Sequence, residues 1–212
     1  MTSPDTEVFP SVSRYLARLP DGAESYPECR CKGSVVRSTL AELPALSTAV
    51  LGTLPPAVQN LITAPPDVSA WTPTVHHNAL LATLFDVRYA IGGTAAFERA
   101  AFEKSRKLLG GPLYRMLFAV LRVERLLHNS ERRWGMFHRG STLTLEAYEE
   151  NARGRCSKTV LRYPPELFFD IPLRSVGQAL RAAVAASGAR DSVLRYESTS
   201  PTTTTFEIRW TE

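Results

Sequence analysis

The sequence has few cysteines and no long apolar run. Its 212 residues include three cysteines, too few for a disulfide framework, and the odd count favours a reducing compartment. No segment approaches the roughly 20 apolar residues that a membrane span requires. The first residues also lack the charged and apolar regions of a secretory signal. These absences predict a cytoplasmic protein without a membrane span.

Recognisable catalytic motifs are absent as well. The chain contains no G-x-S-x-G elbow, no P-loop, no H-E-x-x-H pair and no G-x-G-x-x-G turn. Glu149 and Glu150 are adjacent on a predicted strand, where successive side chains point to opposite faces. They therefore cannot serve as paired carboxylates at one site. We predict that the protein is not an enzyme, with an unfamiliar catalytic constellation as the remaining alternative.

Candidate metal ligands are sparse. One residue separates Cys29 from Cys31, whereas paired cysteines of structural zinc sites usually have about two to four residues between them. No second pair follows, and Cys156 stands alone on a predicted strand. The sequence therefore predicts no metal site and a flexible, reduced cysteine pair.

The charge is mildly basic, with 25 lysines and arginines against 21 acidic residues and a net charge of +4. Basic residues cluster within 104–107, 122–139 and 153–162, but no ribonucleoprotein-type motif accompanies them. We interpret these clusters as solvated faces, and nucleic acid as an unlikely partner. An acidic partner or an anionic ligand head group remains an alternative.

Helical patterns occupy the N-terminal part of the chain. Residues 1–31 carry four prolines and are interpreted as an extension, in which 12–19 form a short helix or a packed arm. Helices are predicted at about 35–51, 55–62, 73–91, 94–109 and 112–127. Pro44 should kink or split the first of them. The glycine pairs at 92–93 and 110–111 flank the fourth.

The hydrophobic period changes to two after residue 130. Strands are predicted at 132–139, 142–150 and 155–163, a helix at 173–187, and a final hairpin at 192–198 and 203–210. This order predicts an α+β fold, with an N-terminal helical bundle packed on a C-terminal four- or five-stranded antiparallel sheet that one helix crosses. We predict a single domain over 32–212, with its helical part at 32–130 and its sheet part at 131–212.

Scattered glycine and apolar positions over residues 32–210 carry a family resemblance. They are Lys32-Gly33, Trp71, Leu109-Gly110 before Pro112, Arg125-Leu126-Leu127, Gly177, Leu180, Gly188-Ala189 and the run from Phe206 to Trp210. On these residues the chain resembles an uncharacterised family of paralogues in myxobacteria. That family is similar to the ligand-binding superfamily of haem nitric-oxide sensors, vinyl-reductase-type domains and transport-particle subunits. The resemblance implies a helical bundle on a twisted antiparallel sheet, with a pocket or channel between them.

The resemblance raises the question of haem. Haem sensors of this superfamily use an axial histidine in the bundle and a Tyr-x-Ser-x-Arg motif that holds the propionates. The corresponding run Tyr196–Ser200 has serine in place of the arginine, on a strand near the C-terminus. The candidate ligands are His76 and His77 on the third predicted helix, and His128 and His138 near the helix-to-sheet junction. Because the motif is incomplete, we predict no haem and no other cofactor.

Aromatic and methionine side chains form the candidate ligand pocket. Such side chains would line a flexible apolar cavity or simply fill the core. The set is Phe85, Phe97, Phe102, Met116, Phe118, Trp134, Met136 and Phe137.

These patterns favour a non-enzymatic sensory or adaptor module in bacterial signalling that binds a small apolar, fatty acid-like ligand or a protein partner. The glycine pairs around 94–109 would let that helix shift when a ligand enters. The alternative is a structural interaction protein without a ligand, which forms a homodimer through its helical bundle.

Overall fold

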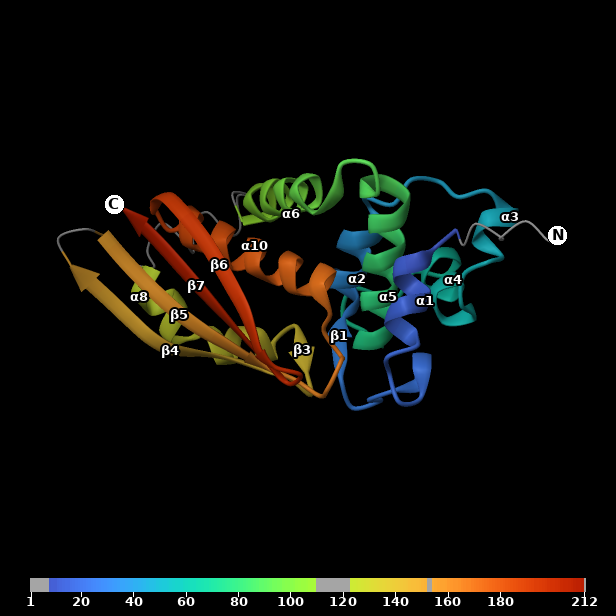
Figure 1. Ribbon diagram of the computed structural model, residues 1–212, viewed down its shortest axis with the longest axis horizontal. Helices are drawn as coiled ribbons and strands as arrows, with labels where there is room; N and C mark the ends of the chain where they lie inside the picture. The colour runs from blue at the N-terminus through green and yellow to red at the C-terminus, as the bar shows by residue number, and fades with distance from the viewer. Residues whose placement is uncertain (1–7, 110–122, 152–153, 212) are drawn as a thin grey trace. The chain divides into compact units, whose positions relative to one another are not determined.

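A computed structural model describes residues 8–109, 123–151 and 154–211 (Figure 1). These residues form helices and antiparallel strands, so the fold class is α+β, as predicted. The chain divides into two compact units, Met1–Gly93 and Thr94–Glu212. Most of the helix predicted at 112–127 lies outside the described residues.

The N-terminal unit surrounds one buried helix, α5. Its elements are α1 (Pro10–Leu16), η1 (Gly22–Glu24), β1 (Arg30–Lys32), α2 (Gly33–Leu40), α3 (Thr48–Leu51), α4 (Pro56–Thr63), β2 (Trp71–Pro73), α5 (Thr74–Leu84) and η2 (Phe85–Tyr89). Ten of the eleven residues of α5 are buried, and α1, α2 and α4 pack on it. A helix without an exposed polar face is stable only when it is enclosed. α5 is therefore the centre of this unit.

The segment that precedes β1 packs into this unit. Val12 and Tyr15 on α1 are buried. The Ser11 hydroxyl donates a hydrogen bond to Asp86 Oδ1 at 2.6 Å, and the Ser11 N–H donates to Oδ2 at 2.9 Å. The short helix predicted within 12–19 therefore forms at 10–16 and is tied to the end of the central helix.

Cys29 and Cys31 are fully buried, which corrects the expectation of a flexible pair. Cys31 lies on β1 opposite Thr72 of β2, in an antiparallel pair. Burial raises the pKa of Cys29 to about 11 and that of Cys31 to about 12. Both thiols are consequently protonated at neutral pH. A Cβ on Gly33, two residues after Cys31, would collide with the carbonyl oxygen of Asp67, so the chain can approach itself here only through glycine.

The C-terminal unit combines a four-stranded sheet with helices (Figure 1). Its elements are α6 (Gly93–Leu109), α8 (Val123–His128), α9 (Ser130–Gly135), β3 (His138–Arg139), β4 (Thr142–Asn151), β5 (Gly154–Arg162), α10 (Asp170–Ala186), β6 (Arg190–Ser200) and β7 (Thr203–Thr211). The strand order is β4-β5-β7-β6, and all neighbours are antiparallel. α10 connects β5 to β6, which confirms the predicted sheet and its crossing helix.

One face of the sheet is the core of this unit. Phe206, Ile208 and Trp210 on β7 are at most 2% exposed, as their alternation with charged residues predicts. Ile208 and Trp210 pack with Val184 of α10 and with Leu127 of α8. The sheet face opposite to them carries charged side chains such as Glu207 and Arg209.

One predicted strand is wrong. Residues 132–135 of the strand predicted at 132–139 belong to the helix α9, and only His138–Arg139 is extended. The Arg133 N–H donates to the Asn129 carbonyl at 3.1 Å, which closes the first helical turn. Tertiary contacts then fix this turn, because the ring of Trp134 stacks on that of His138 at 3.8 Å.

Helix lengths also bear on membrane insertion. Within the described ranges, no helix is long and apolar enough to cross a bilayer.

Candidate ligand pocket

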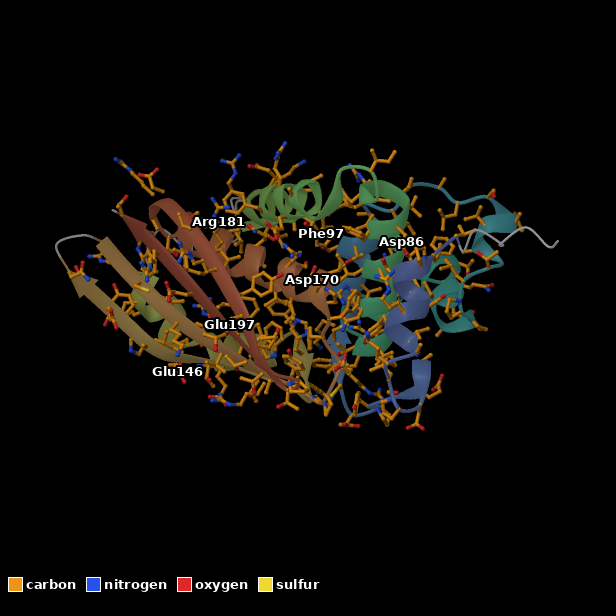
Figure 2. The ribbon with its side chains drawn as sticks, viewed as in Figure 1. Asp86, Phe97, Glu146, Asp170, Arg181 and Glu197 are labelled. Atoms are coloured by element: carbon orange, nitrogen blue, oxygen red, sulfur yellow. The ribbon has the colours of Figure 1, made fainter. Side chains whose placement is uncertain are left out.

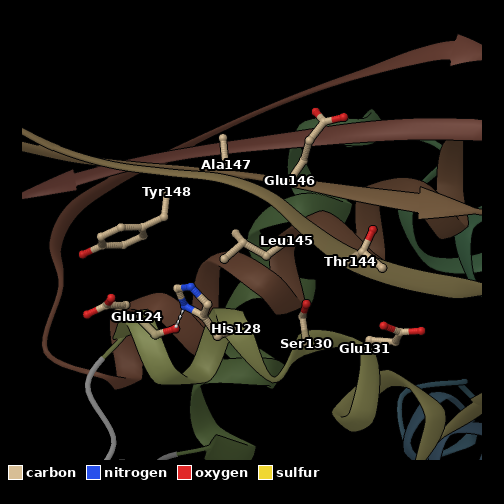
Figure 3. A pocket seen from close by; sticks show the side chains of 9 residues that line it. All are labelled: Glu124, His128, Ser130, Glu131, Thr144, Leu145, Glu146, Ala147 and Tyr148. Carbon is tan, nitrogen blue, oxygen red and sulfur yellow. Dashed lines mark hydrogen bonds between the residues drawn. The ribbon is translucent and has the colours of Figure 1, made fainter.

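A pocket of about 560 Å³ lies between α8, α9 and the edge strand β4 (Figure 3). Both helices pack on β4, so each wall belongs to the C-terminal unit. The lining residues are Glu124, His128, Ser130, Glu131, Thr144, Leu145, Glu146, Ala147 and Tyr148. Its volume is within the range of natural small-molecule sites.

A β-bulge shapes the strand wall. The register of β4 against β5 shifts between Leu145 and Ala147, so that one extra residue, Glu146, is inserted. Figure 3 shows Leu145 directed at the helices and Glu146 directed away from them. The Glu146 carboxylate forms an ion pair with Lys158 at 2.8 Å, and this pair lowers the pKa of the Glu146 carboxyl. Glu146 is therefore already paired with Lys158, on the side of β4 that faces away from α8 and α9.

His128 has a defined orientation. Its Nδ1 lies 2.9 Å from the Glu124 carbonyl oxygen one helical turn earlier. Because a carbonyl oxygen only accepts hydrogen bonds, Nδ1 carries the proton in the neutral ring and Nε2 is left as an acceptor. The helix α8 thus supplies an imidazole nitrogen and a carboxylate, that of Glu124, to the pocket.

Ser130 is the first residue of α9 and is 8% exposed. Figure 3 shows its hydroxyl directed toward β4, between Thr144 and Leu145. No described residue forms a hydrogen bond with this hydroxyl.

The pocket is acidic although the chain is basic. Its lining contains three glutamates and, among the described residues, no lysine or arginine. Glu146 is paired with Lys158, whereas Glu124 and Glu131 form no ion pair with any residue that the structure describes. Burial raises the pKa of Tyr148, so its phenol is uncharged at neutral pH. The helix side of the pocket therefore offers two exposed carboxylates, of which that of Glu124 also attracts the Arg155 guanidinium, and several hydrogen-bond acceptors.

A second polar cluster links α6, α10 and β6. The Arg174 guanidinium forms ion pairs with Glu98 of α6 and, at 2.7 Å, with Asp170 at the start of α10. The Tyr196 hydroxyl donates to Asp170 at 2.7 Å, and burial raises the pKa of Tyr196. Farther along α10 lies Arg181, which is labelled in Figure 2. Its guanidinium makes a cation–π contact with the ring of Phe102 on α6.

The predicted aromatic set is distributed over several elements. Phe85 lies in η2 and Phe97 and Phe102 lie on α6, where Phe97 is buried and Phe102 lies 4.5 Å beneath the Arg181 guanidinium. Trp134 stacks on His138, Phe137 is half-buried and Met136 is 60% exposed. Met116 and Phe118 lie outside the described residues. None of the six described members lines the acidic pocket, and an apolar cavity among them stays a prediction.

The acidic pocket itself was missed by sequence reasoning. Glu124 and Glu131 are seven residues apart, a spacing that places them on one side of a continuous helix. The helix is interrupted at Asn129, however, and the bulge at Glu146 leaves no clear signature in the sequence.

The described residues do not form the haem-anchoring arrangement that the resemblance implies. Tyr196 bonds to Asp170, the Ser198 hydroxyl lies 3.1 Å from that of Thr204, and serine remains at position 200. In the helical unit, His76 Nε2 lies 3.1 Å from the Ala23 carbonyl oxygen and His77 Nε2 lies 3.0 Å from Thr39 Oγ1. These ring nitrogens are occupied by protein contacts. Among the described residues, no group of three metal-binding side chains occurs.

Comparisons with known proteins identify the fold. No protein-family model matches the chain, and no curated protein matches it. The Fe(II) unliganded H-NOX protein from K. algicida is 12% identical, with a TM-score of 0.52 over 85% of this chain and 97% of that one. A Cs H-NOX mutant with 4-cyano-L-phenylalanine at site 5 is 11% identical, with a TM-score of 0.51 over the same shares. The chain therefore has an H-NOX-like α+β fold.

Proposed function

We propose that the protein is a non-enzymatic sensory module that binds a small ligand and signals its presence by movement of α6. The observation that carries this proposal is the way α6 is attached to the C-terminal unit. Two arginines of α10 hold it by polar contacts, Arg174 with Glu98 and Arg181 with Phe102, and its apolar residues Phe97 and Ala101 are buried. Partly exposed ion pairs and cation–π contacts each contribute about 1 kcal/mol or less. Breaking these polar contacts between α6 and α10 therefore requires little free energy.

The start of α6 also permits movement. Gly93 has a φ of +65°, and a Cβ there would meet no atom within 4 Å, so the joint is unobstructed. Such left-handed conformations are readily accessible to glycine. A few backbone rotations at this position would redirect the helix.

A contiguous route connects the acidic pocket to α6. α8 forms one wall of the pocket, and its Leu127 packs in one cluster with Val184 of α10. α10 in turn holds α6 through Arg174 and Arg181. A ligand that repositions α8 would thereby act on the helix that retains α6, provided that it binds the two arrangements with different affinity.

The fold likeness supports a ligand-binding role, because both similar structures are H-NOX proteins, one of them in an Fe(II) form. We do not propose iron for this chain, since His76, His77 and Tyr196 are engaged elsewhere. An apolar, fatty acid-like ligand among the predicted aromatic set, a protein partner and a bacterial cytoplasmic setting remain predictions from the sequence.

Native mass spectrometry of the purified full chain, with an absorption spectrum of the same sample, tests the proposal. We expect an additional mass that leaves on denaturation, without a Soret band. Limited proteolysis before and after ligand removal should then change at residues 94–109. Identical cleavage patterns would contradict the sensory role, and a Soret band would contradict the absence of haem.

The alternative homodimer lacks a supporting feature in the described residues. It requires exposed apolar side chains on the helices predicted at 35–51 and 55–62. The large exposed apolar residues lie elsewhere: Val8, Val68, Val87, Ile91, Leu108, Met136 and Val193. Dimerisation therefore stays a prediction, to be measured by the mass of the native species.

A further inference from the structure

We infer that two copies of the chain dimerise by antiparallel pairing of their β6 strands, so that their two sheets join into one. β6 (Arg190–Ser200) is the last strand in the order β4-β5-β7-β6, and no described strand pairs with its outer side (Figure 1). An exposed strand edge offers unpaired backbone N–H and C=O groups to a further strand. This contact requires no ligand and differs from a dimer through the helical bundle.

The two edge strands of the sheet differ in how they resist such pairing. β4 is interrupted by the bulge at Glu146, carries three glutamates without a basic residue, and has α8 and α9 packed on it. Bulges, charges and covering elements are the usual protection of an edge strand. In β6 the irregularities lie near the ends, pairing with β7 is regular from Val193 to Ser198, and the strand contains neither lysine nor proline. The β6 edge is therefore the less protected one.

Side chains of β6 alternate between the two faces of the sheet. Leu194 lies opposite Ile208 of β7, on the face that forms the core of the unit. Arg195 and Glu197 lie on the other face and are exposed. Because residues directly opposite each other in antiparallel strands share a face, Arg195 and Glu197 of one copy face the exposed side chains of the second copy.

The charges on the exposed face select one register. With Tyr196 opposite Tyr196 of the second copy, Arg195 of each copy lies opposite Glu197 of the other, and the twofold symmetry forms this ion pair twice. A register centred on Arg195 or on Glu197 would instead place like charges opposite each other. A shift of the centre by two residues in either direction separates Arg195 from Glu197. The strand is therefore complementary to itself in one arrangement.

Both charges are available for this contact. Neither Arg195 nor Glu197 forms an ion pair with a residue that the structure describes. Glu207 lies opposite Arg195 on β7, but its carboxylate pairs with Arg209 at 2.6 Å. Exposed ion pairs add little stability, so backbone hydrogen bonds supply the attraction and the charges fix register and partner.

Analytical ultracentrifugation of the full chain over a range of concentrations tests the inference. We expect a reversible monomer–dimer equilibrium. Arg195→Glu and Glu197→Arg should each weaken dimerisation at least about tenfold, because each variant places like charges opposite each other twice. An equimolar mixture of the two variants should restore the dimer, since two glutamates of one copy then face two arginines of the other. The double variant Arg195→Glu/Glu197→Arg should also dimerise like the wild type.

The matched control is Arg162→Glu, which makes the same change of charge at an exposed position on the interior strand β5. It should dimerise like the wild type. A wild-type chain that stays monomeric overturns the inference, as does a dimer that both charge reversals leave intact. An equimolar mixture of the two variants that stays monomeric also overturns it. Circular dichroism checks that each variant is folded.

Amide hydrogen exchange locates the contact. A rise in protein concentration should slow exchange within 190–200 and leave that of 142–151, on the other edge strand, unchanged. Slower exchange at 35–51 and 55–62 instead would assign the dimer to the helical bundle and overturn the inference. A failure here leaves the sensory proposal standing, because that proposal depends on ligand binding and on α6.

Discussion

Buried side-chain polar atoms without a hydrogen-bond partner are fewer in the N-terminal unit, where Glu42 Oε1 is the one among the described residues, than in the C-terminal unit. In the former, His77 bonds to Thr39 and Ser11 bonds to Asp86. In the latter, buried polar atoms lack a hydrogen-bond partner among the described residues at Ser157, Thr159, Gln178 and Trp210. Satisfied networks stabilise one arrangement, while unsatisfied groups destabilise it and are often found at functional sites.

This difference suggests a division of roles. The N-terminal unit, with α5 enclosed on every side, is suited to hold one conformation. The C-terminal unit has a polar pocket, an α6 attached through two arginines, and polar groups that gain partners only from a ligand, from water or from rearrangement. Conformational change should therefore be concentrated in the C-terminal unit.

The largest expected effect is a loss of packing around α5. Leu80 is fully buried, so Leu80→Ala should lower the free energy of unfolding by about 2–5 kcal/mol. Leu108→Ala, at a position that is 56% exposed on α6, should change it by no more than about 0.5 kcal/mol. Urea denaturation measures both. Equal losses would contradict the enclosed position of α5.

Low pH should destabilise the C-terminal unit through the protonation of His138 on unfolding. Burial lowers the pKa of His138 from 6.5 to about 3. Between these values the unfolded chain binds a proton that the folded chain does not, so stability is full above pH 6.5 and decreases as the pH falls toward 3. The loss should be on the order of 2 kcal/mol, since His138 is partly exposed.

His138→Phe provides the comparison for this prediction, because phenylalanine keeps an aromatic ring against Trp134. Urea denaturation of both proteins from pH 7 to pH 4 measures the effect. The variant should lose less stability than the wild type over this range. Identical pH profiles would show that His138 can be protonated freely in the folded state.

A matched pair of isosteric substitutions probes the two kinds of buried hydroxyl directly. Thr39 and Thr159 are 2% and 1% exposed, but only Thr39 has a hydrogen-bond partner. Thr39→Val should lower the free energy of unfolding by about 1–2 kcal/mol, whereas Thr159→Val should be neutral or stabilising. Thermal unfolding compares them. A larger loss for Thr159→Val would mean that its hydroxyl has a partner in solution.

The smallest effect concerns the attachment of α6. Arg174→Gln removes the ion pairs with Glu98 and Asp170 and should cost about 1 kcal/mol or less in global stability. It should nevertheless increase amide hydrogen exchange at 94–109, because local opening needs less free energy than global unfolding. Arg106→Gln, which removes an exposed pair with Glu103, serves as the control. Similar exchange in both variants would contradict the role of Arg174.

Regular patterns made much of the fold predictable from the sequence. The alternation through Phe206, Ile208 and Trp210 identified the half-buried strand β7, and Pro44 indicated the break between α2 and α3. The spacing from Thr94 to Leu109 identified α6 within one residue. In these segments local pattern and tertiary packing agree.

The remaining features depend on contacts between distant residues. The helical turn α9 forms in a predicted strand and packs on β4. The acidic pocket requires the bulge at Glu146 and the close packing of α8 and α9 on β4, none of which has a local signal. The burial of Cys29 and Cys31 likewise had no local signal, and the pair was expected to be flexible.

Hydrogen exchange of the full chain, monitored by mass spectrometry before and after removal of the co-purified small ligand, tests the link between ligand binding and α6 most directly. We predict that ligand removal changes the exchange of residues 94–109 and that α5 in the N-terminal unit is unaffected. Unaltered exchange at 94–109 after complete removal of the ligand would contradict the proposed sensory mechanism.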